Sequence, residues 1–201
     1  MKRMRLTVIA TAVLMGVFVA QAAAEVVYTQ VNVSIPVGGA YNIDLNRDGV
    51  TNFTLRSSFL QDYCQFGDGY VWSLLVIPAN GNAVVTSAGR IGSSNASALL
   101  MGAPVNSASS LYSNVATMAA LYWGVCGTGV AGEWLNQPNR YLGFQFKGAA
   151  NDVHYGWAKV STVAYVDQRG ILHASTVLTG FAYETNPGQA ILTGQTSDGQ
   201  N

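Results

Sequence analysis

The segment from residue 139 to residue 183 constrains the fold most strongly, because three strand-like runs follow one another with turn residues between them. Asn139–Phe146 alternates well, His154–Ala164 follows, and Ile171–Tyr183 is rich in β-branched and aromatic residues. Turn residues separate these runs at Asn151-Asp152 and at Asp167-Gln168-Arg169-Gly170. Short strands bounded by such turns predict an antiparallel β-structure in this half of the chain.

The N-terminal half continues the pattern with less regularity. Val26–Val37 alternates loosely and ends at Pro36 and Gly38-Gly39, which predicts a strand. Further strands are predicted at Tyr41–Ile43, Phe53–Leu55, Val71–Ile77 and Ala190–Leu192. The region from Ala79 to Ala120 is rich in Ala, Ser, Gly and Asn, so we expect short strands and long loops, with a short helix near Ser113–Ala120 as an alternative for that part. The predicted fold class is all-β, as an antiparallel β-sandwich or jelly roll with long Ala/Ser/Gly/Asn-rich loops.

The first 24 residues have the organisation of an export signal. A basic start is followed by the uncharged apolar run Leu6–Val19 and by the small residues Ala22-Ala23-Ala24, before Glu25. The apolar run is about 14 residues long, whereas a membrane-spanning helix needs roughly 20. The sequence therefore predicts a secretory signal peptide over 1–24, a single domain over 25–201 and no membrane span in the mature chain. A secreted or cell-surface protein is expected, with the periplasm as the alternative.

Charge excludes some classes of partner. Removal of residues 1–24 would leave seven basic and ten acidic residues, a net charge of −3. Such a chain has no basic footprint for nucleic acid or for an anionic membrane. Charged residues make up 10% of the sequence, where about a quarter is typical of globular proteins. Solubility must therefore come from Ser, Thr, Asn, Gln and Gly.

Two cysteines, Cys64 and Cys126, lie in the exported part. In an oxidising compartment they predict a single disulfide. Closing a loop of this length would stabilise the fold by about 4 kcal/mol in the chain-entropy account. Two free buried thiols or a metal pair are the alternatives, although two cysteines without CxxC spacing disfavour a zinc site.

The stretch Asp44-Leu45-Asn46-Arg47-Asp48-Gly49-Val50-Thr51-Asn52 carries the most specific chemistry. Oxygen-bearing side chains stand at every second position and are followed by a glycine, which is the spacing that lets a tight loop surround a Ca²⁺ ion. Strands are predicted on both sides of the loop, and Leu55 stands where an EF-hand has its twelfth-position Glu. The predicted ligands are Asp44, Asn46, Asp48, the carbonyl of Val50, and Asn52, either directly or through water.

The loop has a second interpretation. An Asp-Gly turn whose Asp and Asn side chains bond their own backbone would show the same sequence. With two formal charges, calcium affinity should be modest, about 10⁻⁴ to 10⁻³ M. We expect a structural Ca²⁺ that fastens two strands, and Asp62 or Asp68 could complete its ligand shell.

Catalytic signatures are weak. His154 could pair with Asp152 and a serine, but the chain has no Gly-x-Ser-x-Gly nucleophile elbow. His173 has no metal-ligand neighbours at suitable spacing. A glycosidase needs two facing carboxyl groups, for which the sequence offers Glu133, Glu184 and Asp152 without showing that any two face each other. We therefore expect no catalytic residues.

Aromatic residues offer a further type of site. Large aromatic side chains could stack on sugar rings or could fill the core of the fold. The candidates for a stacking platform are Trp123, Trp134 and Trp157, with Tyr63, Tyr70 and Tyr122. Core filling is the favoured interpretation because aromatic side chains dominate β-sheet cores.

Several blocks carry a resemblance to a protein group. They read Ile43-Asp44-Leu45-Asn46-Arg47-Asp48-Gly49-Val50, Gly132-Glu133-Trp134, Asn139-Arg140-Tyr141-Leu142-Gly143-Phe144-Gln145-Phe146, His154-Tyr155-Gly156-Trp157-Ala158-Lys159-Val160 and Gly180-Phe181-Ala182-Tyr183-Glu184-Thr185. Together they resemble a group of exported, β-rich bacterial proteins, some of which carry a C-terminal surface-sorting tag. The resemblance implies export and a β fold, and it implies no activity. The tag is absent here, and Lys159 stands where the group would have Arg.

These observations favour a non-enzymatic, secreted β-sandwich with a structural or interaction role at the cell surface or matrix. Its partners would be polysaccharide or other surface or matrix proteins. A carbohydrate-binding module that uses exposed aromatic residues is the first alternative. A secreted hydrolase is the second, and it requires two carboxylates or a Ser/His pair to converge in a pocket.

Overall fold

The computed structural model describes residues 25–65, 67–87, 95–125 and 127–197, without the side chains of residues 62–64. These ranges contain strands and no helix, which confirms the predicted all-β class. The strands are β1 (Val26–Ile35), β2 (Ala40–Ile43), β3 (Phe53–Cys64), β4 (Gly67–Pro78), β5 (Ala83–Val85), β6 (Pro104–Val105), β7 (Leu111–Tyr112), β8 (Ala116–Gly124), β9 (Gly129–Gly132), β10 (Arg140–Lys147), β11 (Val153–Val166), β12 (Leu172–Glu184) and β13 (Ile191–Leu192).

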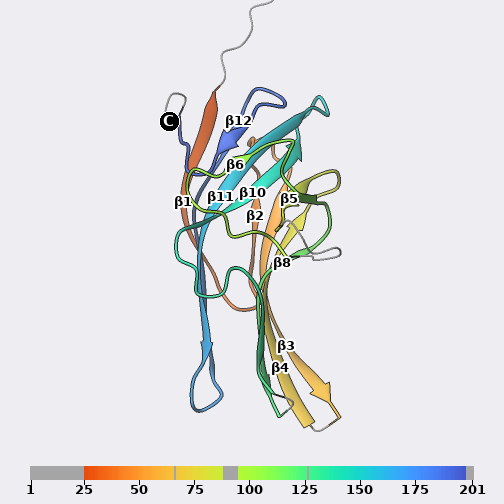
Figure 1. Ribbon diagram of the computed structural model, residues 1–201, viewed down its shortest axis with the longest axis vertical. Helices are drawn as coiled ribbons and strands as arrows, with labels where there is room; N and C mark the ends of the chain where they lie inside the picture. The colour runs from red at the N-terminus through yellow and green to blue at the C-terminus, as the bar shows by residue number, and fades with distance from the viewer. Residues whose placement is uncertain (1–24, 66, 88–94, 126, 198–201) are drawn as a thin grey trace, which may run out of the picture.

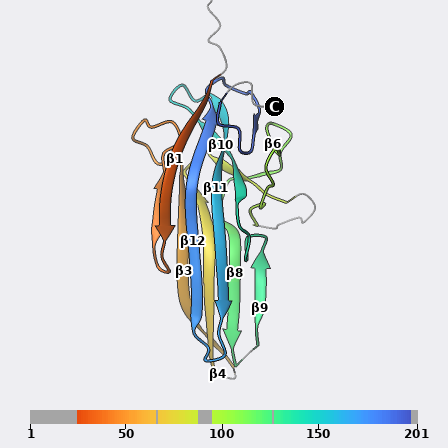
Figure 2. The same cartoon turned by 90° about the vertical axis from the view of Figure 1, so that its left-hand side faces the viewer.

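Two antiparallel sheets form the layers of a sandwich (Figure 1). The first has the strand order β1-β12-β11-β10-β5-β7, and the second has the order β2-β3-β4-β8-β9. Figure 2 shows the first sheet face-on, with β3, β4 and β8 behind it. A separate two-stranded pair joins β13 to β6. The predicted run from residue 139 to residue 183 is the meander β10-β11-β12, and β1 pairs with its last strand.

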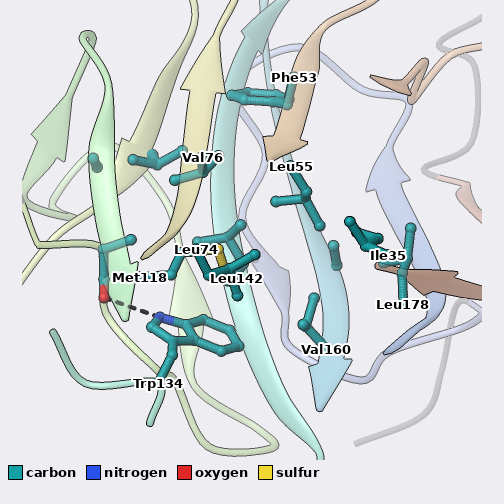
Figure 3. Packing of buried hydrophobic residues seen from close by; sticks show 14 of the residues in the cluster. Ile35, Phe53, Leu55, Leu74, Val76, Met118, Trp134, Leu142, Val160 and Leu178 are labelled. Carbon is teal, nitrogen blue, oxygen red and sulfur yellow. Dashed lines mark hydrogen bonds between the residues drawn. The ribbon is translucent and has the colours of Figure 1, made fainter. Parts of the chain in front are cut away.

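The core lies between the two sheets because alternate side chains of each strand point inward. In β3 and β4, Phe53, Leu55, Leu74 and Val76 are fully buried. They meet buried side chains of the other sheet, such as Leu142, Val160 and Leu178, as Figure 3 shows. The rings of Phe53 and Phe144 stack at 4.1 Å between centroids, which joins the sheets near the start of β3.

The helix predicted near Ser113–Ala120 is wrong. Residues 116–124 form strand β8, which lies between β4 and β9 and pairs with both. The alanines of this segment favour a helix by intrinsic propensity, but two neighbouring strands supply hydrogen bonds along its backbone. Its buried Met118 and Ala119 pack in the core. Tertiary pairing has therefore overridden the local preference.

Two long hairpins extend toward the same end of the molecule. The β3–β4 hairpin and the β11–β12 hairpin belong to different layers, and Figure 1 shows their tips diverging. The loop between β2 and β3 and the turn between β10 and β11 lie at the opposite end of these strands. That end holds the candidate site. No helix in the described ranges is long and apolar enough to cross a membrane.

Candidate functional site

The loop of residues 44–52 is closed by pairing of the strands on either side of it. Ile43 pairs with Phe53 across β2 and β3, and the Asn52 N–H donates to the Ile43 carbonyl at 2.8 Å. Gly49 has a φ of +86°, which lets the chain turn sharply after Asp48. The sequence placed both the strands and this turn correctly.

The two loop carboxylates bond the loop's own backbone. Asp44 Oδ2 accepts from the Gly49 N–H at 2.8 Å, and Asp44 Oδ1 accepts from the Asp48 N–H at 3.3 Å. Asp48 Oδ1 accepts from the Val50 N–H at 2.8 Å. These are the contacts of a turn capped by Asp side chains. They also hold both carboxylates within one loop, so that two negative charges are fixed close together.

The side-chain oxygen of Asn46 has no hydrogen-bond partner in this loop. Its Nδ2 donates to Asp48 Oδ2 at 2.8 Å, whereas its Oδ1 is buried and has no hydrogen-bond partner. A buried polar atom without a partner is costly, because it has lost its hydration without replacement. This oxygen occupies the third ligand position of the predicted calcium loop.

Asn52 serves the fold of the loop. Its side chain is buried, and its Oδ1 accepts from the Leu45 N–H at 2.7 Å. Its backbone carbonyl accepts from the Ala79 N–H and from Asn82 Nδ2. These bonds favour a structural role for Asn52 over the predicted role as a ninth-position ligand. Val50 is exposed, and its carbonyl remains a predicted ligand.

Replacing Asn52 with alanine should destabilise the protein by about 1–3 kcal/mol, because the Leu45 N–H would be left buried without an acceptor. Urea unfolding with and without Ca²⁺ measures this loss. We expect an equal loss under both conditions. A loss confined to the calcium-containing sample would instead assign Asn52 to the metal shell.

A hollow of about 300 Å³ adjoins the loop. It brings together segments that are far apart in the sequence: the loop, the end of β10 with its turn, the start of β11 and the end of β12. The lining residues are Asn46, Phe146, Gly148, Ala149, Ala150, Asp152, His154, Tyr183 and Thr185. Sequence reasoning raised the His154–Asp152 pair and Asn46 in different contexts, and it gave no signal that all three line one hollow.

His154 meets Asp152, as one catalytic interpretation of the sequence required. Its Nε2 lies 3.3 Å from Asp152 Oδ2, and its Nδ1 lies 3.0 Å from the Glu184 carbonyl oxygen. Thr185 and Tyr183 supply the hydroxyl groups among the residues lining this hollow, which include no serine or cysteine. Within the lining of this hollow, no serine or cysteine therefore accompanies the pair as the nucleophile of a hydrolase triad.

The other candidate carboxylates have local partners. The Glu133 carboxylate accepts from the Ser87 hydroxyl and from the Ala98 N–H, so it ties together the two ends of one connection. Glu184 is buried and accepts from the Asn186 N–H at 2.9 Å. Each therefore has a structural explanation.

Electrostatics link Tyr183 to the loop. Burial raises the pKa of the Tyr183 phenol, and the nearby carboxylates of Glu25, Asp44 and Asp48 raise it further, against an opposing effect of Arg47. Arg47 itself donates to the Thr29 hydroxyl at 3.0 Å. The end of β12 thus lies within the electrostatic field of the loop, which carries net negative charge.

The three candidate stacking tryptophans lie in the interior. Trp134 is fully buried, Trp157 is 2% exposed and Trp123 is 9% exposed. Burial favours the core-filling interpretation for all three, since a sugar ring needs an accessible aromatic face. Trp123 also packs beside Phe59 and Tyr70, with ring centroids 5.8 and 5.7 Å away.

Two further predictions fall partly or wholly outside the described residues. Cys126 and the segment 1–24 are not described, so the disulfide with Cys64 and the signal peptide remain predictions. Among the described residues, no three His, Cys, Asp or Glu side chains are grouped as a metal site. The predicted calcium loop has a different donor set, of two Asp side chains, Asn oxygen and carbonyl oxygen.

Comparison with known proteins adds no relatives: no protein-family model, curated protein or solved structure matches this chain. The resemblance to exported bacterial proteins therefore remains a prediction. Function has to be argued from the residues themselves.

Proposed function

We propose that this protein is an exported, non-enzymatic β-sandwich with a structural or interaction role outside the cytoplasm, and that its Asp44–Asn52 loop binds a structural Ca²⁺ ion. The observation that carries the proposal is the unpartnered, buried Oδ1 of Asn46, which lies in one tight loop with the carboxylates of Asp44 and Asp48.

Calcium suits this set of donors. Ca²⁺ prefers oxygen ligands from carboxylates, amides and backbone carbonyls. The proposed ligands are Asp44, Asn46, Asp48 and the Val50 carbonyl, completed by water. With two formal charges in the shell, we expect an affinity of about 10⁻⁴ to 10⁻³ M, which is typical of extracellular modules.

A bound Ca²⁺ ion would strengthen the contact between the two sheets at the end where the loop lies. The loop joins β2 to β3 in one sheet, while Asn46 and Tyr183 line a hollow shared with the other sheet. A cation in the loop would offset the repulsion between Asp44 and Asp48 and would give Asn46 Oδ1 a partner. The proposed result is a firmer join between the two layers at this end.

The test is an NMR titration of the purified protein with Ca²⁺, following the Gly49 N–H that bonds Asp44 Oδ2. We expect saturable shifts at Gly49 in the wild-type protein, and at least tenfold weaker binding for Asp44→Asn. Asp68→Asn is the matched control. Asp68 is exposed and pairs with Tyr63 beside the tip of the β3–β4 hairpin, at the other end of β3 from the loop, so it does not complete the shell as the sequence allowed. Equal affinity of the two variants would sink the proposed site.

A glycan-binding role is the second candidate, and one observation favours it. Phe59 lies against Tyr70 and Trp123 near the tip of the β3–β4 hairpin. Phe59, which is 43% exposed, offers the accessible aromatic face, whereas Trp123 is buried beside it. Co-sedimentation of the protein with insoluble polysaccharides would detect such binding. This candidate uses an end of the molecule opposite the calcium loop.

A further inference from the structure

The turn between β4 and β5 holds the single Asn-Gly pair of the sequence, Asn80-Gly81. The Asn82 N–H donates to the Ala79 carbonyl at 3.0 Å, which closes a β-turn around the pair. Gly81 has a φ of +85°, the sign that a type II turn requires at its third position. Both residues of the pair are exposed, so water reaches the Asn80 amide and the peptide bond that follows it.

The Gly81 N–H and the Asn80 side chain are free to react with each other. The turn is closed through the Asn82 N–H, and the Gly81 N–H has no acceptor among the described residues. Within the same part of the chain, the Asn80 side chain has no hydrogen-bond partner. Because glycine has no Cβ, its nitrogen is not shielded from the side chain before it. The Gly81 nitrogen and Asn80 Cγ can therefore join in a five-membered ring.

We propose that Asn80 is a site of spontaneous deamidation, in which its side-chain amide is hydrolysed by way of a cyclic imide. The Gly81 nitrogen attacks Asn80 Cγ, and the new N–Cγ bond forms as the Cγ–Nδ2 bond breaks. The proton of the Gly81 N–H leaves with Nδ2 as ammonia. Water then opens the imide: cleavage at Cγ gives an aspartyl linkage, and cleavage at the backbone carbonyl carbon gives an isoaspartyl linkage.

Lys147 places a positive charge beside the pair. A Cβ atom added to Gly81 would lie 3.3 Å from Lys147 Cδ and 3.9 Å from its Nζ. The attack requires the Gly81 nitrogen to lose its proton, and the product carries a carboxylate. An ammonium group nearby stabilises both negative charges. The charge of Lys147 therefore favours the reaction at Asn80.

Two other asparagines differ from Asn80 in their hydrogen bonds. Asn106 also precedes a small residue, Ser107, but its Oδ1 accepts from the Ala108 N–H at 2.9 Å. Asn82 is buried, and its Nδ2 and its Oδ1 both form hydrogen bonds. Asn106 is therefore the internal comparison for Asn80.

The isoaspartyl product would change the turn, because Asn80 Cβ would become part of the backbone. Both ends of the turn bond one atom: the Ala79 N–H and Asn82 Nδ2 donate to the Asn52 carbonyl at 2.9 and 3.0 Å. An additional backbone carbon between these two donors would strain or break their bonds. We therefore expect the isoaspartyl protein to be less stable than the unmodified protein. This inference does not depend on calcium binding, because the reaction uses no residue of the calcium loop.

The experiment ages the purified protein at mildly alkaline pH and follows each asparagine by peptide mapping and mass spectrometry. A synthetic peptide of residues 78–84 is aged beside it, and sampling ends when Asn80 of the peptide has fully converted. We expect Asn80 of the protein to convert about tenfold or more faster than Asn106, because glycine leaves its nitrogen unshielded. Labelling with an isoaspartyl methyltransferase identifies the isoaspartyl product.

Asn80→Gln is the matched control, because a glutamine would have to close a larger and less favourable ring. Asn80 is exposed and unbonded within the described residues, so this variant keeps the native contacts. Aged wild-type protein should unfold at a lower urea concentration than fresh protein, whereas aged Asn80→Gln should unfold at an unchanged one.

Two outcomes would overturn the proposed site: an intact Asn80 in the protein after the peptide has converted, or conversion of Asn106 before Asn80. Conversion of Asn80 to the isoaspartyl form with an unchanged urea midpoint would overturn the inferred loss of stability.

Discussion

Replacing Trp134 with alanine is expected to lower the free energy of unfolding by about 3–5 kcal/mol. The indole is fully buried in the core, where Figure 3 shows it beside Met118. Its Nε1 donates to the Ala96 carbonyl at 3.0 Å, so truncation leaves both a cavity and an unpartnered acceptor. Urea denaturation of the variant and the wild-type protein measures the loss.

The control is Tyr122→Ala in strand β8, because that aromatic side chain is 41% exposed. Truncating it removes less buried area, so its loss should be much smaller. Equal losses for the two variants would mean that Trp134 is not a central core residue.

Gly132→Ala should also be strongly destabilising, by about 2–5 kcal/mol. Gly132 has a φ of +80°, and an added Cβ would lie 2.1 Å from the Met118 carbonyl oxygen. That carbonyl accepts the Trp134 N–H at 3.1 Å, so the backbone shift needed to relieve the clash would disturb the Trp134 anchor. Chemical denaturation again gives the measurement.

Gly170→Ala separates the cost of the left-handed backbone from the cost of the clash between the added Cβ and the Met118 carbonyl oxygen. Gly170 has nearly the same φ, +79°, but an added Cβ would have no atom within 4 Å. The control should therefore lose about 1 kcal/mol, the cost of the left-handed backbone alone. If Gly132→Ala loses no more than Gly170→Ala, the close approach to Met118 is energetically unimportant.

Local patterns predicted the strands whose sequence is regular. The meander from residue 139 to residue 183 alternates and has clear turn residues, so its strands and connections could be placed. The turn at Gly49 followed from the same reasoning. Strand β3 runs on to Cys64, well past the predicted Leu55, because Arg56 and Ser57 break the apolar pattern while β4 still pairs with them.

Pairing between strands that are far apart in the sequence could not be predicted from local patterns. Nothing local to residues 113–120 reports that β4 and β9 lie on either side, so an alanine-rich strand looks like a helix. The turn of residues 44–52 could be predicted because its polar side chains and Gly49 lie within nine residues, whereas calcium binding there stays a prediction. The hollow could not, because Asn46, His154 and Tyr183 meet only once both sheets are in place.

The measurement that tests the account most directly is a thermal melt of the protein in Ca²⁺ against the same melt in chelator. At about ten times the dissociation constant, a bound Ca²⁺ would add about 1.4 kcal/mol and raise the Tm by about 3–6 °C. We expect that rise for the wild-type protein and for Asp68→Asn, and its loss in Asp44→Asn. A Tm that is the same in Ca²⁺ and chelator would contradict the account and would leave residues 44–52 as a polar turn.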